Sequence, residues 1–132
     1  MNELLQREYQ SKLTTAREAV KLVRSGDTVF LGASSSVAYA LCDALGEREN
    51  DLEDVTLTSS QVIRPIHIMS GSNPKVFRAC TFFMGPQERT MFNHGAADFT
   101  TVHLSQVDIF SVKLHLQMWR FLKCLYLMKM AT

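Results

Sequence analysis

The sequence is poor in the residues that mark several special classes of protein. Its 132 residues include only three cysteines, with no C-x-x-C or other metal-ligand spacing, which excludes a disulfide-stapled miniprotein and a zinc module. Six glycines and three prolines against 46% hydrophobic residues exclude collagen-like and disordered chains. No apolar run reaches the roughly 18 residues of a membrane span, so we expect no membrane partner.

Charge and leader-type features are also sparse. The net charge is only +1, so no basic field favours a nucleic acid partner. The opening MNELLQREYQ is mixed in charge and lacks an apolar h-region, which predicts no signal peptide and a cytoplasmic location. A chain of this length is expected to form one domain around one core.

The composition changes near residue 110. Residues 1–110 carry ten Lys/Arg against thirteen Asp/Glu, whereas residues 111–132 carry four basic residues and no acidic one. The second segment also contains Trp119, which is the only tryptophan, and three of the seven methionines. Such a break indicates two segments with different histories.

Short apolar runs that alternate with helical periodicity predict the secondary structure. Helices are predicted at 16–24, 37–48 and 86–93, with a short one at 3–10, and strands at 28–32, 55–58, 76–79 and 99–102. Thr15 followed by Glu18 is typical of a capping box, and Ser36 is the expected N-cap of the second helix. Strands that alternate with helices predict an α/β fold, with a mainly parallel sheet and flanking helices.

The first candidate site is the GASSS junction between a predicted strand and a predicted helix. It comprises Gly32, Ala33, Ser34, Ser35 and Ser36. Ligands of open α/β sheets gather at the carboxyl ends of strands, where a helix N-terminus can hold an anion. The alternative is a plain connecting loop with a serine cap.

The second candidate lies at the end of the next predicted strand. Ser59, Ser60 and Gln61 are expected near the same edge of the sheet, although ordinary turn chemistry also explains them. No G-x-S-x-G elbow surrounds these serines, so a nucleophilic serine has little support.

Four histidines form the third candidate set. None pairs at i, i+4 and no H-E-x-x-H occurs, so we expect no metal site. His103 is the best placed because it directly follows the last predicted strand, but a hydrogen-bonded structural role is the commoner case. The set comprises His67, His94, His103 and His115.

Two single residues complete the candidates. Arg89, beside a Gly-Pro turn, is suited to binding phosphate or carboxylate, although a solvated face or an internal ion pair is commoner. Cys42 lies in an apolar helical run, which predicts a buried, inert thiol.

Three segments together resemble a known family. SGDTVFLGASSSVAYALCDALGER, DVTLTSS and FFMGPQERTMFNHGAADFTTVHLSQVD are similar to the N-terminal domain of the acetyl-CoA hydrolase/transferase family, over about residues 9–110. The resemblance implies a NagB/RpiA/CoA-transferase-like α/β fold, incomplete in this chain. It also implies two such domains and a homodimer for the full-length family.

The resemblance implies CoA transfer between an acyl-CoA and acetate or a related small carboxylic acid, with coenzyme A thioester as substrate and no bound cofactor. The family nucleophile is a glutamate of the C-terminal domain, which forms a glutamyl-CoA intermediate. No glutamate of this chain matches it, so we expect no catalytic residue here and an inactive chain. Acetyl-CoA hydrolysis is the near alternative. The implied substrate-binding residues are Gly32, Ala33, Ser34, Ser35, Ser59, Ser60, Gln61, His103, Ser105 and Gln106.

Residues 111–132 depart from the family. The letters QMWRFLKC can be encoded by bases that spell DVAVFEVS, a family-like strand, when they are read one frame over. We therefore predict a partial CoA-transferase domain at 1–110 and an aberrant basic tail, a frameshift product, at 111–132. The alternative is a non-catalytic α/β binding module with a basic amphipathic tail. The apolar face of such a tail would comprise Leu114, Met118, Phe121, Leu122 and Leu125.

Overall fold

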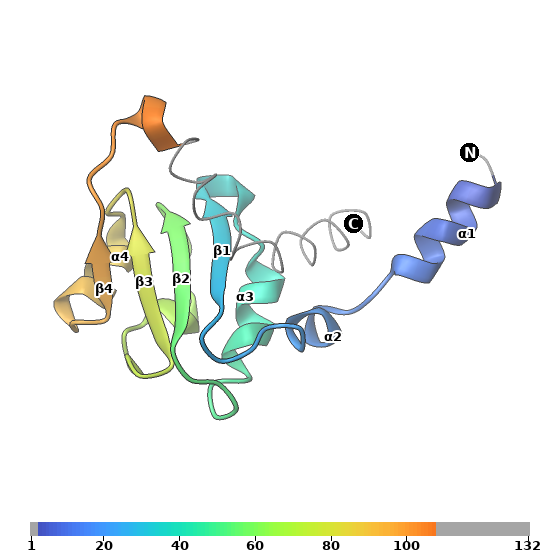
Figure 1. The fold of residues 1–132 in the computed structure, drawn as a ribbon, viewed down its shortest axis with the longest axis horizontal. Helices are drawn as coiled ribbons and strands as arrows, with labels where there is room; N and C mark the ends of the chain where they lie inside the picture. The colour runs from blue at the N-terminus through green and yellow to red at the C-terminus, as the bar shows by residue number, and fades with distance from the viewer. Residues whose placement is uncertain (1–2, 108–132) are drawn as a thin grey trace.

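The computed structural model describes residues 3–107, and they contain a four-stranded parallel sheet. The strands stand side by side in chain order, and all their arrows point the same way (Figure 1). They are β1 (Thr28–Ala33), β2 (Val55–Ser60), β3 (Phe77–Thr81) and β4 (Ala97–Phe99). The predicted α/β class with a mainly parallel sheet is confirmed. The predicted break at residue 111 lies outside the described residues.

Residues 3–107 also contain four α-helices and three single turns of 3-10 helix. Helix α2 packs on α3, and α4 packs on β3 and β4, while α1 projects away from the sheet (Figure 1). No helix in this part of the chain is long and apolar enough to cross a membrane. The helices are α1 (Glu3–Lys12), α2 (Ala16–Val20), α3 (Tyr39–Gly46) and α4 (Pro86–Asn93), with η1 (Ser34–Ser36), η2 (His67–Met69) and η3 (Leu104–Gln106).

The core lies between the sheet and the helices. Strands β1 and β2 contribute apolar side chains that are fully buried, as expected for parallel strands covered by crossover helices. The largest buried apolar side chains are Leu31, Leu41, Leu45, Leu57, Ile68, Met69 and Met91.

The helices differ from the prediction at their ends. Helix α2 stops at Val20, and turns continue the chain to Arg24. Helix α3 begins at Tyr39, so Ser36 is not its N-cap. The Ser36 hydroxyl oxygen instead accepts the Ala33 N–H at 3.0 Å and its O–H donates to the Ala33 carbonyl at 2.7 Å, which closes a turn within η1.

Strand β4 is displaced from the predicted range 99–102. Gly95 has a φ of +69°, which ends α4 and returns the chain at once to the sheet. The Ala96 carbonyl then accepts the Ala79 N–H at 2.8 Å, and β4 follows. Alanines pack well beneath a helix but carry little strand propensity, so the apolar pattern pointed to the later residues.

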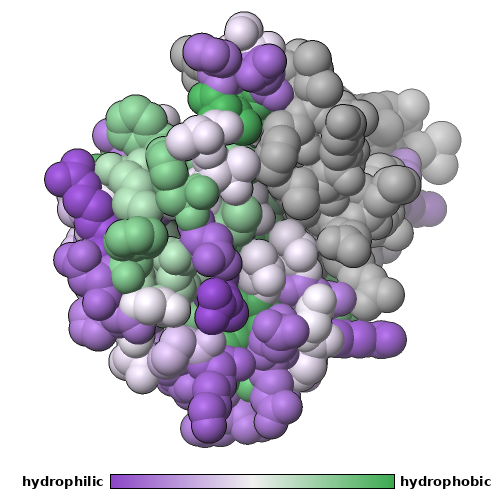
Figure 2. All heavy atoms as spheres, turned by 60° about the vertical axis from the view of Figure 1, so that its left-hand side comes forward, coloured by the Kyte–Doolittle hydropathy of each residue, from purple (hydrophilic) through white to green (hydrophobic). Residues whose placement is uncertain are grey.

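The side of the molecule formed by β4 and α4 is apolar at its surface. Phe83, Phe92 and Phe99 are between 44% and 55% exposed, and they come from the end of β3, from α4 and from β4. Figure 2 shows hydrophobic surface gathered on this side. Because Phe99 is exposed, the side chains of β4 do not separate into an apolar buried face and a polar exposed face. This weak pattern also explains why the predicted bounds of β4 are wrong.

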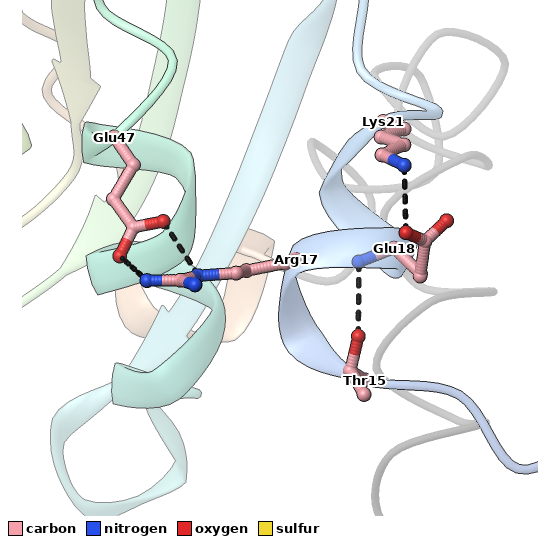
Figure 3. Close-up of polar contacts among 5 residues, drawn as sticks. All are labelled: Thr15, Arg17, Glu18, Lys21 and Glu47. Atoms are coloured by element: carbon pink, nitrogen blue, oxygen red, sulfur yellow. Dashed lines mark hydrogen bonds and ion pairs between the residues drawn. The ribbon is translucent and has the colours of Figure 1, made fainter.

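Polar contacts join α2 to α3. The Thr15 hydroxyl oxygen accepts the Glu18 N–H at 3.2 Å, which confirms the Thr15 half of the predicted capping box. The Glu18 carboxylate pairs with Lys21 (Figure 3). Between the two helices, the Arg17 guanidinium forms an ion pair with the Glu47 carboxylate, with N–O distances of 2.8 and 2.9 Å. This hydrogen bond and the charge of Glu47 raise the pKa of Arg17.

A second arginine acts deeper in the same interface. Arg48 is half-buried and donates hydrogen bonds to the backbone carbonyls of Val20 and, at 2.8 Å, Val23. These carbonyls lie at and just beyond the C-terminus of α2, where the helix dipole favours a cation. Arg48 therefore caps the short α2 and ties it to the chain after α3.

We expect Arg48→Ala to lower the free energy of unfolding by about 2 kcal/mol, because charge-assisted hydrogen bonds to two partly buried carbonyls are lost. Arg17→Ala is the matched control, because its ion pair is exposed and screened by solvent. Urea denaturation of both variants measures the difference. An equal loss in the two variants would contradict this assignment.

Candidate functional site

The carboxyl ends of the four strands share one edge of the sheet. β1 runs directly into η1, β2 ends beside Gln61, and η3 lies beyond the same edge after β4 (Figure 1). This edge is where open α/β sheets bind ligands, because the connecting loops leave it accessible.

The end of β1 is a tight turn that requires a glycine. The register with β2 shifts between Phe30 and Gly32, which bulges the strand. Gly32 has a φ of +96°, and a Cβ built there would lie 2.8 Å from the Ser36 carbonyl oxygen. The GASSS segment is therefore a tight turn of fixed conformation and not an extended linker.

The structure brings the first two candidate segments together. The Ser34 N–H donates to the Gln61 carbonyl at 3.1 Å, and the Ser34 hydroxyl donates to the Gln61 side-chain oxygen at 3.4 Å. Both residues have left-handed backbones, with φ values of 49° and 57°. Such conformations are unfavourable for residues with a Cβ and cluster at functional sites, so this contact holds two strained corners against each other.

The remaining residues of these segments differ in exposure. Ser35 is exposed, while Ala33 and Ser60, which pair in the β1–β2 register, are half-buried. Ser59 is fully buried, and its hydroxyl points inward. The edge therefore presents the exposed groups of Ser35 and Gln61 above a buried polar layer.

Sequence reasoning missed the centre of that buried layer. Glu88, on α4, is fully buried, and its Oε1 accepts the Ser59 hydroxyl at 3.1 Å and the Val62 N–H at 2.8 Å. Its Oε2 has no hydrogen-bond partner among the described residues. A Cβ built at Gly85 would lie 2.7 Å from Oε2. The available signal was Gly-Pro-x-Glu, which places a glycine at the N-cap and a carboxylate at the third helical position.

Arg64 was also overlooked. Its guanidinium lies 4.3 Å from the centroid of the Tyr39 ring and donates to the Asp43 carboxylate at 3.0 Å. The Arg64 N–H donates to the Tyr39 hydroxyl oxygen at 3.2 Å. These contacts fix the segment after β2 against the start of α3.

The segment from His103 to Gln106 lies at the same edge, beyond the end of β4 (Figure 1). His103, Ser105 and Gln106 are exposed, and within residues 3–107 their hydrogen bonding is limited to the Gln106 N–H, which donates to the His103 carbonyl at 2.8 Å. β4 ends at Phe99, so His103 follows the strand by four residues. The prediction that His103 directly follows the strand is therefore wrong.

The other candidates have structural contacts. His94 Nδ1 lies 2.7 Å from the Thr90 carbonyl, and Arg89 donates to the Met84 carbonyl at 3.3 Å. His67 lies 2.5 Å from Glu49, and hydrogen bonds from His67 and then Asn73 lower the pKa of Glu49. Within the described part of the chain, no three His, Cys, Asp or Glu residues gather as metal ligands. His115 lies outside it.

Cys42 is a buried, inert thiol, as predicted. Its side chain is 1% exposed, and burial, followed by the nearby charge of Asp43, raises its pKa from 9.0 to about 12. The thiolate that nucleophilic chemistry needs is therefore strongly disfavoured.

A hollow of about 600 Å³ lies at the opposite, amino edge of the sheet. Its lining includes one cation, Lys75, among several carboxylates. Those carboxylates disfavour an anionic ligand, whereas the carboxyl edge presents neutral hydroxyl and amide groups. The acidic lining residues are Glu49, Asp51, Glu53 and Asp54.

Comparisons with known proteins agree on one family. The family described as acetyl-CoA hydrolase/transferase N-terminal domain matches residues 1–113. The butyryl-CoA:acetate CoA-transferase of Anaerostipes caccae is 34% identical over 101 residues, which are 76% of this chain and 23% of that protein. A probable butyrate:acetyl-CoA coenzyme A-transferase of Syntrophomonas wolfei is 46% identical over 57 residues, which are 43% of this chain and 13% of that protein.

Solved structures show the same fold. RipA from Yersinia pestis matches with a TM-score of 0.65 at 20% identity, covering 77% of this chain and 26% of RipA. A mutant form of RipA matches with a TM-score of 0.68 at 23% identity, over the same shares. The matches thus span between 13% and 26% of the length of these relatives.

We expect Gly32→Ala to lower the free energy of unfolding by about 1–3 kcal/mol from backbone strain, with the clash against Ser36 in addition. Gly26→Ala is the control, because Gly26 has a φ of +79° but nothing within 4 Å of an added Cβ. Thermal unfolding of both variants separates strain from clash. Equal losses would show that the GASSS turn is looser than described.

The raised pKa of Cys42 also predicts how stability depends on pH. Above pH 9 the unfolded chain loses the thiol proton while the folded chain keeps it, so stability falls with rising pH until about pH 12. Cys42→Ala should remove this contribution, about 1.4 kcal/mol per pH unit at most. Denaturation at pH 8, 9 and 10 compares the slopes, and identical slopes would contradict the raised pKa.

Proposed function

Because this chain belongs to the acetyl-CoA hydrolase/transferase family, through its N-terminal domain, we propose that it forms the N-terminal part of an acyl-CoA:carboxylate CoA-transferase. The proposed substrates of the whole protein are an acyl-CoA and acetate or a related small carboxylic acid. We place the domain at residues 1–110, and the family match, which ends at residue 113, supports that boundary.

One observation carries the proposed role of this chain: the Ser34–Gln61 contact at the carboxyl edge. It fixes two corners whose hydroxyl and amide groups face outward, with Ser35 and Gln61 exposed. Neutral donors of this kind orient a carboxylate or a thioester carbonyl without binding it so tightly that exchange stops. We assign Gly32–Ser35 and Ser59–Gln61 to the wall of an acyl-substrate cleft, with His103, Ser105 and Gln106 at its rim.

The proposed chemistry needs a carboxylate nucleophile. A glutamate attacks the thioester carbonyl, the C–S bond breaks, and an acyl-glutamyl anhydride and CoA thiolate form. The thiolate then attacks the glutamyl carbonyl, the acyl group leaves as a carboxylate, and a glutamyl-CoA thioester remains. A second carboxylate reverses these steps. Water at the same intermediate would give hydrolysis, which is the near alternative.

We propose that this chain does not supply the nucleophile. Glu88 is the glutamate at the carboxyl edge, and it is fully buried and bonded to Ser59 and Val62, so it is not available to a substrate. Loss of a covalent nucleophile lowers rates by several orders of magnitude. The chain alone therefore binds substrate without turnover.

We expect the 132-residue chain to bind butyryl-CoA but to transfer no CoA from it to labelled acetate. In a titration followed by amide NMR, shift changes should centre on Ser34, Ser35 and Gln61. Turnover that is lost on mutation of one of the chain's own glutamates would contradict the proposal, as would shifts centred on Asp51 and Asp54.

Gln61→Gly separates binding from stability in this titration. It relieves the left-handed strain, so the melting temperature should rise, while loss of the side-chain amide should weaken butyryl-CoA binding about three- to tenfold. Asp54→Gly is the matched control, because Asp54 has a φ of 52° but lies at the amino edge. It should raise stability without changing affinity.

A further inference from the structure

We infer that Glu88 is a positioning residue for the carboxyl-edge site, an inference that rests on the proposed function. Glu88 lies on α4, yet its carboxylate reaches the chain at the end of β2, 26 to 29 residues earlier in the sequence. It is one of the few fully buried polar side chains of the described chain. A carboxyl group in such a place needs a reason, because moving a polar group out of water is costly unless hydrogen bonds replace its hydration.

The two hydrogen bonds to Oε1 bracket Gln61. The Ser59 hydroxyl donates from the strand and the Val62 N–H donates from the residue after Gln61. A single acceptor atom therefore holds the residues on both sides of Gln61 toward the interior. Gln61 lies between them with a φ of 57°, and it turns outward to the solvent.

The effect reaches the other strand through the Gln61 carbonyl. That carbonyl accepts the Ser34 N–H at 3.1 Å, so the orientation of the corner after β2 sets the position of η1. Glu88 thus positions Gln61, and Gln61 in turn positions Ser34. A side chain that is out of reach of any ligand thus determines where the exposed groups stand.

Packing alone does not explain the choice of residue. Oε2 has no hydrogen-bond partner among residues 3–107, so the carboxylate is only half satisfied. An apolar side chain of similar volume would avoid that cost but could accept neither hydrogen bond. The position of Glu88 in the first turn of α4 offsets part of the cost, because the helix dipole favours an anion there.

Gly85 supplies the space that this arrangement needs. Its φ of −77° is available to any residue, so the glycine is not required by the backbone. A Cβ there would lie 2.7 Å from Glu88 Oε2 and 3.3 Å from the Gln61 Cα. Because Gly85 has no Cβ, the Glu88 carboxylate and the Gln61 backbone can both pack against it.

The test compares Glu88→Ala and Glu88→Gln in the full chain. The amide retains an acceptor oxygen for both hydrogen bonds, whereas alanine retains none. Glu18→Ala is the matched control, because Glu18 occupies the same third helical position in α2 but is 58% exposed. Val20→Ala is the stability control, because it opens a cavity in a fully buried part of α2, away from the edge.

Two readouts are measured: amide hydrogen exchange at Val62 and Ser34, and affinity for butyryl-CoA. We expect Glu88→Ala to accelerate both exchange rates and to weaken binding about tenfold, which corresponds to the loss of one good hydrogen bond. Glu88→Gln should restore both readouts to within about threefold of the wild type. Glu18→Ala and Val20→Ala should change neither the local exchange pattern nor the affinity.

Unchanged exchange at Val62 and Ser34 in Glu88→Ala, beyond the change in Val20→Ala, overturns the inference. If Glu88→Ala does not fold, Ser59→Ala replaces it, and it should accelerate exchange at Ser34 while the Val62 contact persists. Failure of the wild-type chain to bind butyryl-CoA, with the expected exchange pattern in the variants, overturns the proposed function and leaves the positioning role supported.

Discussion

The carboxylate of Glu88 is the contact on which the carboxyl edge of the sheet depends. From helix α4 it accepts hydrogen bonds from Ser59 in β2 and from Val62 just after β2, and so it couples the third crossover of the chain to the start of the second. The Ser34–Gln61 contact that joins the ends of β1 and β2 is built on this support. In this protein a polar contact inside the core, and not a surface network, determines the shape of the site.

Much of the fold follows from the sequence because β1 contains a short apolar run, β2 begins with Val and Leu residues that alternate with Thr, and α4 begins with Pro86 after Gly85. The predicted bounds of β4 are wrong because Ala97, at its start, and Ala96, just before it, carry little strand propensity and pack by their small size. The edge that carries the site was predictable from the alternation of strands and helices, whereas the Ser34–Gln61 contact also requires β1 and β2 to be neighbours. Glu88 was not recognised because a glutamate at the third helical position has the same pattern whether buried or exposed.

The two edges of the sheet differ in electrostatic character. Carboxylates surround the hollow at the amino edge, where a hydrogen bond to His67 also lowers the pKa of Glu49. At the carboxyl edge, the Glu88 side chain is fully buried and Arg64 is paired with Asp43. Among the described residues, carboxylates therefore gather around the hollow at the amino edge, whereas the exposed groups of Ser35 and Gln61 at the carboxyl edge are neutral.

The strand order β1-β2-β3-β4 repeats the order of the chain, so every strand pairs with the one that precedes it. Parallel sheets usually fold slowly, because their strands are distant in sequence and loop closure must come first. Here each closure spans a single crossover, so contact order is low for a parallel sheet. During synthesis from the N-terminus the sheet can grow one strand at a time, and each nascent strand finds its partner already in place. Among the described strands, each newly added strand leaves an unpaired outer edge, and the next strand pairs with that edge.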